Sequence, residues 1–334
     1  MYNNIARPNK NGEKNRAAEK DTRPVLIFDT DMDTDCDDAA ALVLVMQAHL
    51  AGLATLAGVV TDSLSPHAAP CCEAFLLYYG LSCPVGAVHT EDYPQKGPDA
   101  QRFAAYRKHR LLCRDRCYNS VLAAPIGRTD RDYPRAGLFY RRLLADADDA
   151  SLTVLCIGTL TAVAEALASL PDEISPYDGI TLFRRKVQRV VCMGDPGRTG
   201  DFNWSMDATA AQYFFAHCPV PIHISPEGRD ILTGASFSLR LPPLHPLRRA
   251  YEIWLGGPGL GRSSWDPIAA LYALRPDAPV FSVRPFGNCR YDPATAAAFS
   301  MPSDTPRDSL VRLPEHSGQT VRMLESCMLD ACFP

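Results

Sequence analysis

Short apolar runs alternate with longer segments of helical periodicity along most of the chain. Six runs have the length and the β-branched content of buried strands: residues 25–28, 53–61, 84–88, 152–157, 187–193 and 221–225. Six further segments are typical of helices: residues 39–50, 68–79, 136–147, 160–170, 207–217 and 266–274. The alternation predicts an α/β fold of three layers, in which helices cover both faces of a mainly parallel open sheet.

The segments outside this alternation have weaker patterns. Residues 1–23 are polar and poor in apolar side chains, so we expect a disordered N-terminal tail. Residues 90–134 are expected to be irregular with some helix, and the last sixty residues to mix strands, loops and a final helix. Residues 24–334 are predicted to form a single domain.

Composition and charge narrow the classes of function. With 334 residues, of which 46% are hydrophobic, the chain can bury a large core. Its formal net charge is −4 and its basic residues are scattered, so we expect a small-molecule partner and neither a nucleic acid nor a membrane. The chain has no apolar stretch long enough to span a bilayer and no N-terminal signal core, so we expect a soluble, cytoplasmic protein.

Twelve cysteines are dispersed along the chain without paired CxxC spacing. Because no secretory signal precedes them, we expect reduced thiols. His109, Cys113 and Cys117 have the spacing i, i+4 and i+8, which would place them on one face of a helix. A zinc site there would lack a fourth ligand, so we favour a coincidence of surface residues.

An acidic loop follows the first apolar run and holds six aspartates within ten residues: Asp29, Asp31, Asp33, Asp35, Asp37 and Asp38. Like charges this close repel by about 1 kcal/mol per pair in water, so folding alone gives no reason to gather them. A strand-to-helix loop lies at the carboxyl ends of the strands in an open α/β sheet, where ligands bind. Oxygen ligands suit Ca²⁺ or Mg²⁺, which favours a bound cation over a solvated loop that only caps a helix.

The acidic loop and later segments resemble one known family. DTDMDTDCDDAAAL is similar to the N-terminal signature of the inosine-uridine preferring nucleoside hydrolase family, in its variant form DTDxGxDxDDAxAL. Later segments resemble the family's helix and third strand, its metal-contacting strand and turn, its sugar-binding segment and its last metal-binding helix: SPHAAPCCEAFLLYYG with CPVG, LTVLCIGTLTAV, VVCMGDPGRTGDFNWSMDATAAQYFF and SSWDPIAALYAL. The match keeps the family's order from residue 25 to about residue 275.

The resemblance implies the nucleoside hydrolase fold and one bound Ca²⁺. The ion would be held by the side chains of Asp31, Asp38 and Asp266 and by the backbone carbonyl of Ile157. These ligands leave room, in a shell of six to eight oxygens, for water and two sugar hydroxyls. The resemblance also implies that the protein forms homo-oligomers.

The implied activity is hydrolysis of the N-glycosidic bond of a ribonucleoside or a related N-ribosyl compound by a metal-activated water. Asp31 would be the general base, Asp37 would accept a hydrogen bond from a ribose hydroxyl, and Asp201 with Asn203 would hold the rest of the sugar. Cleavage builds positive charge on the ribose ring, so a ring of carboxylates also stabilises the transition state.

Three positions depart from the family pattern. Asp33 replaces a glycine of the acidic loop, where the backbone can need a positive φ. Asp62 replaces an asparagine that contacts ribose; we expect it to contact the sugar as well, although it can only accept hydrogen bonds when ionised. Trp265 replaces a histidine that protonates the departing base; it can stack on a base but supplies no proton. Glu227 and His223 are candidate replacement acids, although each is expected to be structural.

Two other enzyme or metal-site classes share part of the acidic pattern. A haloacid dehalogenase-type phosphatase also begins with a strand followed by DxD, but it needs an aspartate where this chain has Thr199. An EF-hand also places oxygens at alternate positions, but it needs a glycine at Thr34 and a glutamate at Ala40.

A third alternative is a catalytically silent protein that binds a metal and a ribosyl compound on the same fold. Fold does not guarantee function, and the three substitutions all fall on the expected pocket. The sequence leaves this alternative open.

Overall fold

A nine-stranded sheet runs through the centre of the computed structural model, which describes residues 23–93, 98–314 and 318–334. The strand order within this described part is β10-β9-β11-β6-β5-β4-β1-β2-β3. The predicted tail, residues 1–23, lies outside the described residues except for Arg23.

The parallel part of the sheet extends on both sides of its first strand, β1. β1 (Val25–Thr30) pairs with both β2 (Thr55–Thr61) and β4 (Leu152–Cys156). The remaining parallel strands continue on the two sides: β3 (Val85–Ala87) next to β2, and β5 (Val187–Met193) with β6 (Ile222–Ser225) beyond β4. The chain order therefore reverses between β1 and β4, and such a switch point opens a crevice at the carboxyl ends of the strands.

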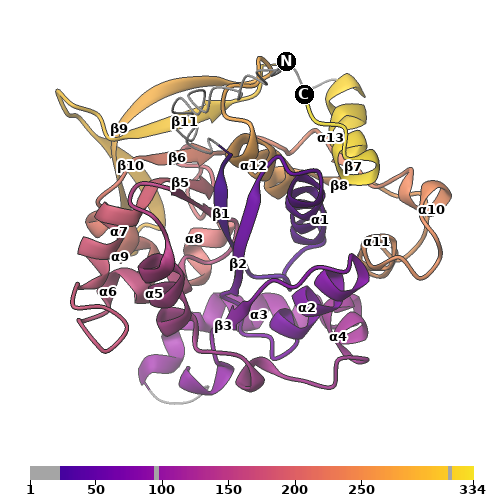
Figure 1. Cartoon of the computed structure of the whole chain (residues 1–334), viewed down its shortest axis with the longest axis horizontal. Coiled ribbons are helices and arrows are strands. Elements are labelled where there is room, and N and C mark those ends of the chain that lie inside the picture. Colours follow the sequence, from indigo (N-terminus) through magenta and orange to yellow (C-terminus); the bar gives the residue numbers. More distant parts are fainter. Residues whose placement is uncertain (1–22, 94–97, 315–317) are drawn as a thin grey trace, which may run out of the picture.

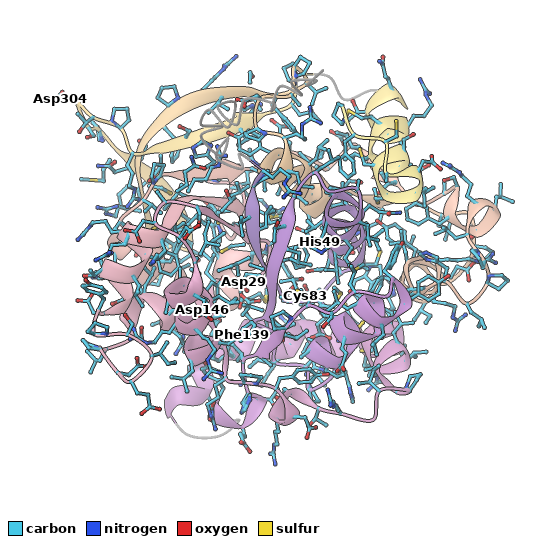
Figure 2. All side chains as sticks on the ribbon, in the orientation of Figure 1. Asp29, His49, Cys83, Phe139, Asp146 and Asp304 are labelled. Carbon is cyan, nitrogen blue, oxygen red and sulfur yellow. The ribbon has the colours of Figure 1, made fainter. Side chains whose placement is uncertain are left out.

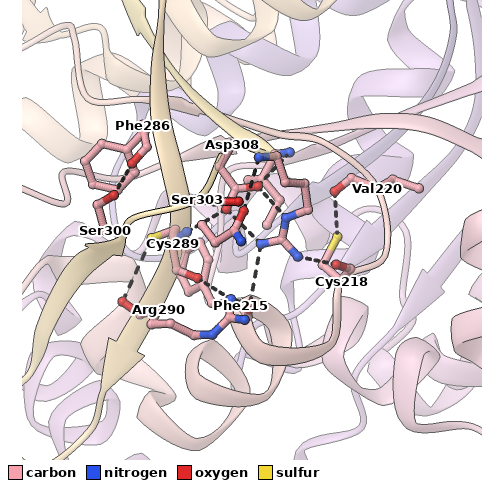
Figure 3. Close-up of polar contacts among 12 residues, drawn as sticks. Phe215, Cys218, Val220, Phe286, Cys289, Arg290, Ser300, Ser303 and Asp308 are labelled. Atoms are coloured by element: carbon pink, nitrogen blue, oxygen red, sulfur yellow. Dashed lines mark hydrogen bonds and ion pairs between the residues drawn. The ribbon is translucent and has the colours of Figure 1, made fainter. Parts of the chain in front are cut away.

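Three C-terminal strands extend the sheet beyond β6: β9 (Ser282–Asp292), β10 (Ala297–Met301) and β11 (Asp308–Arg312). β11 is parallel to β6, whereas β9 runs antiparallel to both β10 and β11. Asp308 is fully buried and joins these strands, because its carboxylate accepts hydrogen bonds from Cys289 N (2.7 Å), Ile222 N (3.3 Å) and Arg307 Nε (2.6 Å) (Figure 3). The carboxylate thus fixes the register of the added strands against β6.

One face of the sheet is covered by α1 (Asp37–Leu50), α2 (Ala68–Tyr78), α11 (Pro246–Leu255), α12 (Trp265–Leu274) and α13 (Gly318–Asp330). Leu26 and Phe28 of β1 belong to this core, whereas Ile27 points into the core on the other face. α1 is buried around most of its surface because it packs against α12, β2 and α13. This explains why its sequence is apolar on all sides.

The other face is covered by α5 (Ala136–Asp146), α6 (Thr161–Ala168), α7 (Gly179–Lys186) and α9 (Ala208–His217). In Figure 1, α1 lies on one side of β1 and β2, and α5 and α6 lie on the other. The structure therefore confirms the predicted three-layer α/β fold with a mainly parallel sheet. The predicted strands and helices all occur, with ends displaced by at most two residues; α1 begins at Asp37 rather than at residue 39.

The segment predicted as irregular contains several short helices. They are α3 (Ala104–Leu112), α4 (Tyr118–Ala123) and the 3-10 helices Thr90–Asp92, Pro98–Phe103, Arg114–Arg116 and Asp130–Asp132. Smaller elements that the pattern did not predict are α8 (Phe202–Met206), α10 (Phe237–Arg240), β7 (Leu232–Thr233) and β8 (Arg262–Ser263).

The described helices and the cysteines relate to the expectations about the membrane and about reduced thiols. Among the described helices, none combines the length and the apolar character needed to cross a bilayer. All twelve cysteines lie in the described part and carry free thiols, most of them buried.

Candidate active site

A cavity of about 440 Å³ lies at the carboxyl ends of the parallel strands, where the chain order reverses. The loop after β1 brings the acidic residues to it, and the loop after β4 brings Ile157. Eight of the nine residues predicted for the site line this cavity: Asp31, Asp37, Asp38, Ile157, Asp201, Asn203, Trp265 and Asp266. Segments from four distant parts of the sequence thus converge on one chamber.

The backbone of the acidic loop holds two of its carboxylates in place. Met32 adopts a left-handed conformation with φ +37°, and its N–H donates to Asp38 Oδ1 (3.2 Å). The same Asp38 oxygen accepts a hydrogen bond from the Thr30 hydroxyl, and the Thr34 hydroxyl donates to Asp31 Oδ2 (2.6 Å). Asp33 itself is outside the left-handed region, so the strained residue of the loop is its neighbour.

Three carboxylates form the tightest acidic cluster in the described part of the chain. Oxygens of Asp37, Asp38 and Asp266 lie within 4.8 Å of one another, and all three residues are buried. Asp266 lies in the first turn of α12, and its N–H donates to Asp37 Oδ2 (3.2 Å). This set shares Asp38 and Asp266 with the predicted ligands and adds Asp37, which the sequence assigned to the sugar.

The cavity floor consists of these three residues and Asp31. Burial raises the pKa of all four floor carboxyls, and mutual repulsion adds to it. For Asp31 the next contribution is the charge of Asp62, and for Asp266 it is the charge of Asp37. A divalent cation within the cluster would offset both effects and keep the carboxyls ionised. The donor set of buried carboxylate oxygens next to a backbone carbonyl therefore fits a hard cation such as Ca²⁺.

Asn203 and Asp201 close the cavity on the side of β5. The Asn203 side-chain amide donates to the Ile157 carbonyl (2.9 Å), so the predicted sugar contact and the predicted carbonyl ligand touch each other. Asp201 caps α8 by accepting from Trp204 N (3.2 Å), and it also accepts from Asp195 N (2.9 Å). Burial raises the pKa of Asp201 to about 6.

Asp62 is the predicted site residue that does not line the cavity. It is buried behind the loop after β4, where a Cβ on Gly158 would lie 2.2 Å from Asp62 Oδ1. Burial raises the pKa of Asp62, and the charge of Asp29 adds to the effect. Asp29, which is labelled in Figure 2, is fully buried and accepts a hydrogen bond from the Tyr140 hydroxyl (2.5 Å). The geometry therefore does not support the expected contact between Asp62 and ribose.

Asp33 points away from the cavity and is bound by residues of the segment that precedes α5. Arg110 Nε lies 2.7 Å from Asp33 Oδ2, the Asn119 amide donates to Oδ1 (2.9 Å), and the Tyr106 hydroxyl donates to Oδ2 (3.2 Å). These partners come from α3 and α4. The substitution of aspartate for glycine is thus matched by a dedicated set of partners that attach α3 and α4 to the acidic loop.

Several cavity residues were not predicted from the sequence. Asp35 forms a two-bond ion pair with Arg262, whose guanidinium lies 5.1 Å from the centre of the Trp265 ring. His109 lines the cavity, with Nε2 3.1 Å from the Thr34 carbonyl and with its ring edge against Phe202. The remaining unpredicted lining residues are Thr34, Met193, Gly194, Asp195, Arg198, Phe202, Pro226, Arg229 and Trp254.

The two candidate acids named from the sequence do not line the cavity. Glu227 pairs with Arg312 (2.9 Å), and His223 contacts the Tyr272 hydroxyl through Nδ1 (2.6 Å). Burial lowers the pKa of His223 to about 4. Within the described residues, Asp37, Asp38 and Asp266 form the cluster that can hold a metal ion. His109, Cys113 and Cys117 do not form a second such cluster there.

Comparisons with known proteins agree with this geometry. A family model described as inosine-uridine preferring nucleoside hydrolase matches residues 26–321. No curated protein matches the chain.

Three solved structures with 15–17% sequence identity share the fold. A structure described as the type III effector protein XopQ complexed with adenosine diphosphate ribose has a TM-score of 0.68, over 93% of this chain and 94% of that one, at 17% identity. An inosine-uridine preferring nucleoside hydrolase from Bacillus anthracis has a TM-score of 0.62, over 91% and 99%, at 16% identity. A plant nucleoside hydrolase, PpNRh1, has a TM-score of 0.61, over 92% and 99%, at 15% identity.

Proposed function

The chain belongs to the inosine-uridine preferring nucleoside hydrolase family, and from that premise we propose that it hydrolyses the N-glycosidic bond of a ribonucleoside or a related N-ribosyl compound. The observation that carries the proposal is the convergence of Asp31, Asp38, Ile157 and Asp266 on one cavity. A ligand set assembled from the loops after β1 and β4 and from the start of α12 has no evident structural use without a cation.

We assign calcium to the side chains of Asp31, Asp38 and Asp266 and to the Ile157 carbonyl, with Asp37 adjoining them. When bound, the ion supplies positive charge that orients the sugar hydroxyls and the attacking water. Asp31 is the general base, and its position is fixed by the Thr34 hydroxyl. Asp37 accepts a hydrogen bond from a ribose hydroxyl, and the floor carboxylates stabilise the positive charge that develops on the ring.

The leaving base would lie beside Trp265 at the cavity wall. Trp265 offers a stacking face, and the Arg262 guanidinium covers part of its ring. His109 can supply the proton that Trp265 lacks. Because the Thr34 carbonyl only accepts, His109 Nε2 donates to it. His109 therefore acts as the acid in its imidazolium form, in which Nδ1 carries the second proton and transfers it to the leaving base.

A binding protein without turnover is the second candidate function. The similar structure of an effector is described as complexed with adenosine diphosphate ribose, so this fold can hold a ribosyl compound. The phosphatase alternative finds no support, because the chain matches a different family. The EF-hand alternative finds none either, because a strand and not a helix precedes the acidic loop.

Release of free ribose from a panel of nucleosides, with calcium present, tests the proposed function. We expect turnover of at least one purine or pyrimidine ribonucleoside and faster turnover of p-nitrophenyl riboside, whose leaving group needs little protonation. The control omits calcium and adds a chelator. If no substrate is hydrolysed while the calcium-loaded protein still binds ribose, the silent binding protein is the correct interpretation.

The replacement His109→Ala tests the leaving-group acid. General-acid catalysis is worth about 10²- to 10⁴-fold, so we expect kcat for a purine nucleoside to fall about 10²-fold, with kcat for p-nitrophenyl riboside nearly unchanged. The comparison of the two substrates on one variant is the internal control. An equal loss on both substrates would mean that His109 acts only through the structure of the acidic loop.

A further inference from the structure

Two arginines line the cavity at the ends of neighbouring strands. Arg198 lies in the loop after β5, and Arg229 lies in the loop after β6. Both side chains are exposed, and neither makes a hydrogen bond or an ion pair with another residue of the described ranges. Their charges are therefore available to a ligand that enters the cavity.

The third arginine at the cavity is different, because its charge is already balanced. Arg262 is bound by the Asp35 carboxylate through Nε (2.8 and 2.7 Å). The ion pair lies beside Trp265, which the proposed function places next to the leaving base. The cavity arginines without a direct ion pair to a described residue thus lie in the loops after β5 and β6.

The position of Arg198 relates this charge to one end of the substrate. Arg198 is three residues from Asp201, and its positive charge acts to lower the pKa of that carboxyl. Under the proposed function, Asp201 and Asn203 hold the part of the sugar that is away from the floor carboxylates. An anionic group attached to that part of the sugar would meet Arg198, with Arg229 one strand further along the same edge of the sheet.

We propose that the preferred substrates carry a phosphate on the sugar, so that the protein acts on nucleoside monophosphates in preference to nucleosides. Guanidinium groups suit phosphate because their planar N–H donors match two phosphate oxygens at once. The proposal rests on the proposed function and names its substrate class. Water forms a bond to the anomeric carbon, the bond from that carbon to the base nitrogen breaks, and the base takes a proton. The products are ribose phosphate and the free base, and the phosphoester stays intact.

The kinetic test compares inosine 5′-monophosphate with inosine on the calcium-loaded protein. We expect KM for the monophosphate to be at least tenfold lower, and this preference to weaken as NaCl is raised. In the double variant Arg198→Ala/Arg229→Ala, the ratio of the two KM values should fall to about one. The matched control is Arg284→Ala, which removes an exposed arginine on β9 and should keep the preference. Equal KM values in the unmodified protein, or a preference that survives the double variant, would overturn the proposal.

A binding test separates this inference from the proposed hydrolysis. Thermal unfolding is measured with ribose 5-phosphate and with ribose at equal concentrations. We expect the larger rise in Tm with ribose 5-phosphate, and loss of the difference in the double variant. Preferential binding of ribose 5-phosphate without any turnover would support the phosphate-binding role of Arg198 and Arg229 but reject hydrolysis, and with it the monophosphate as a substrate. Nucleoside turnover without phosphate preference would support hydrolysis and reject the inference.

Discussion

Replacing Asp38 with asparagine should remove both the activity and the stabilisation of the protein by calcium. Asparagine keeps the carbonyl oxygen that accepts from Thr30 and Met32, so the loop retains its hydrogen bonds. What is lost is the charge within the cluster of Asp37, Asp38 and Asp266. We expect ribose release to fall by roughly 10²- to 10³-fold, as when one electrostatic group of a transition-state site is removed.

The unfolding temperature of the same variant provides an independent readout. In unmodified protein, calcium should raise Tm progressively with concentration, because an ion held by the proposed site would bind only the folded chain. In Asp38→Asn this rise should vanish, while the calcium-free variant should unfold at a higher temperature than calcium-free unmodified protein. The reason is that burial and like charges raise the pKa of Asp38, so its carboxylate opposes folding when no cation is bound.

The matched control for this charge removal is Asp195→Asn. Asp195 lines the cavity but lies outside the floor cluster, and its Oδ1 accepts a hydrogen bond from Gly197 N (2.9 Å). Calcium should stabilise this control as it stabilises the unmodified protein. A full calcium response in Asp38→Asn would contradict the assigned cation site.

The replacement Gly158→Ala should damage both the stability and the activity of the protein, because the added Cβ has no room between two loops of the site. A Cβ at this position would lie 2.2 Å from Asp62 Oδ1 and 2.7 Å from the backbone nitrogen of Asp31. The Asp31 nitrogen belongs to the backbone that positions the proposed general base. Relief of the clash must therefore move the loop after β1 or the loop after β4. We expect a loss of about 1–3 kcal/mol in the free energy of unfolding, together with a large loss of activity.

Chemical denaturation and ribose release would measure the effects of Gly158→Ala. The control is Gly257→Ala, because a Cβ there meets no heavy atom within 4 Å and the residue is outside the left-handed region, so its effect should stay within about 0.5 kcal/mol. Adding Asp62→Ala to Gly158→Ala should recover part of the stability, since it removes one of the two clashes. The packing argument would be refuted if Gly158→Ala had normal activity and unfolded at the same denaturant concentration as the unmodified protein.

The fold was predictable because periodicity and burial agree in this chain. The apolar run of β1 and the all-round apolar α1 have the patterns expected of a strand and a helix buried inside a three-layer domain. By contrast, α7 has only eight residues and ends in three basic ones, and most of β9 is only partly buried, so neither has the long buried pattern of α1 or β1.

The candidate site was predictable where chemistry and position coincide. Six clustered aspartates after a buried strand indicate a cation site through their charge and their place in the chain alone. The same reasoning could not place Asp62, because only the close packing of Gly158 shows that the side chain lies behind the cavity wall. It could not find His109 either, because that residue reaches the cavity from α3, in a segment without a clear pattern, and its spacing to two cysteines pointed to a different site.

The joining of the first and last parts of the cavity floor has a consequence for synthesis of the protein. Asp37 and Asp266, which are joined by a hydrogen bond, are 229 residues apart in the chain. During translation, the aspartates of the acidic loop are therefore synthesised long before Asp266, the last residue of the floor cluster. Affinity for calcium should appear only in chains extended beyond α12, which makes ion capture a marker of completed maturation rather than an early aid to it.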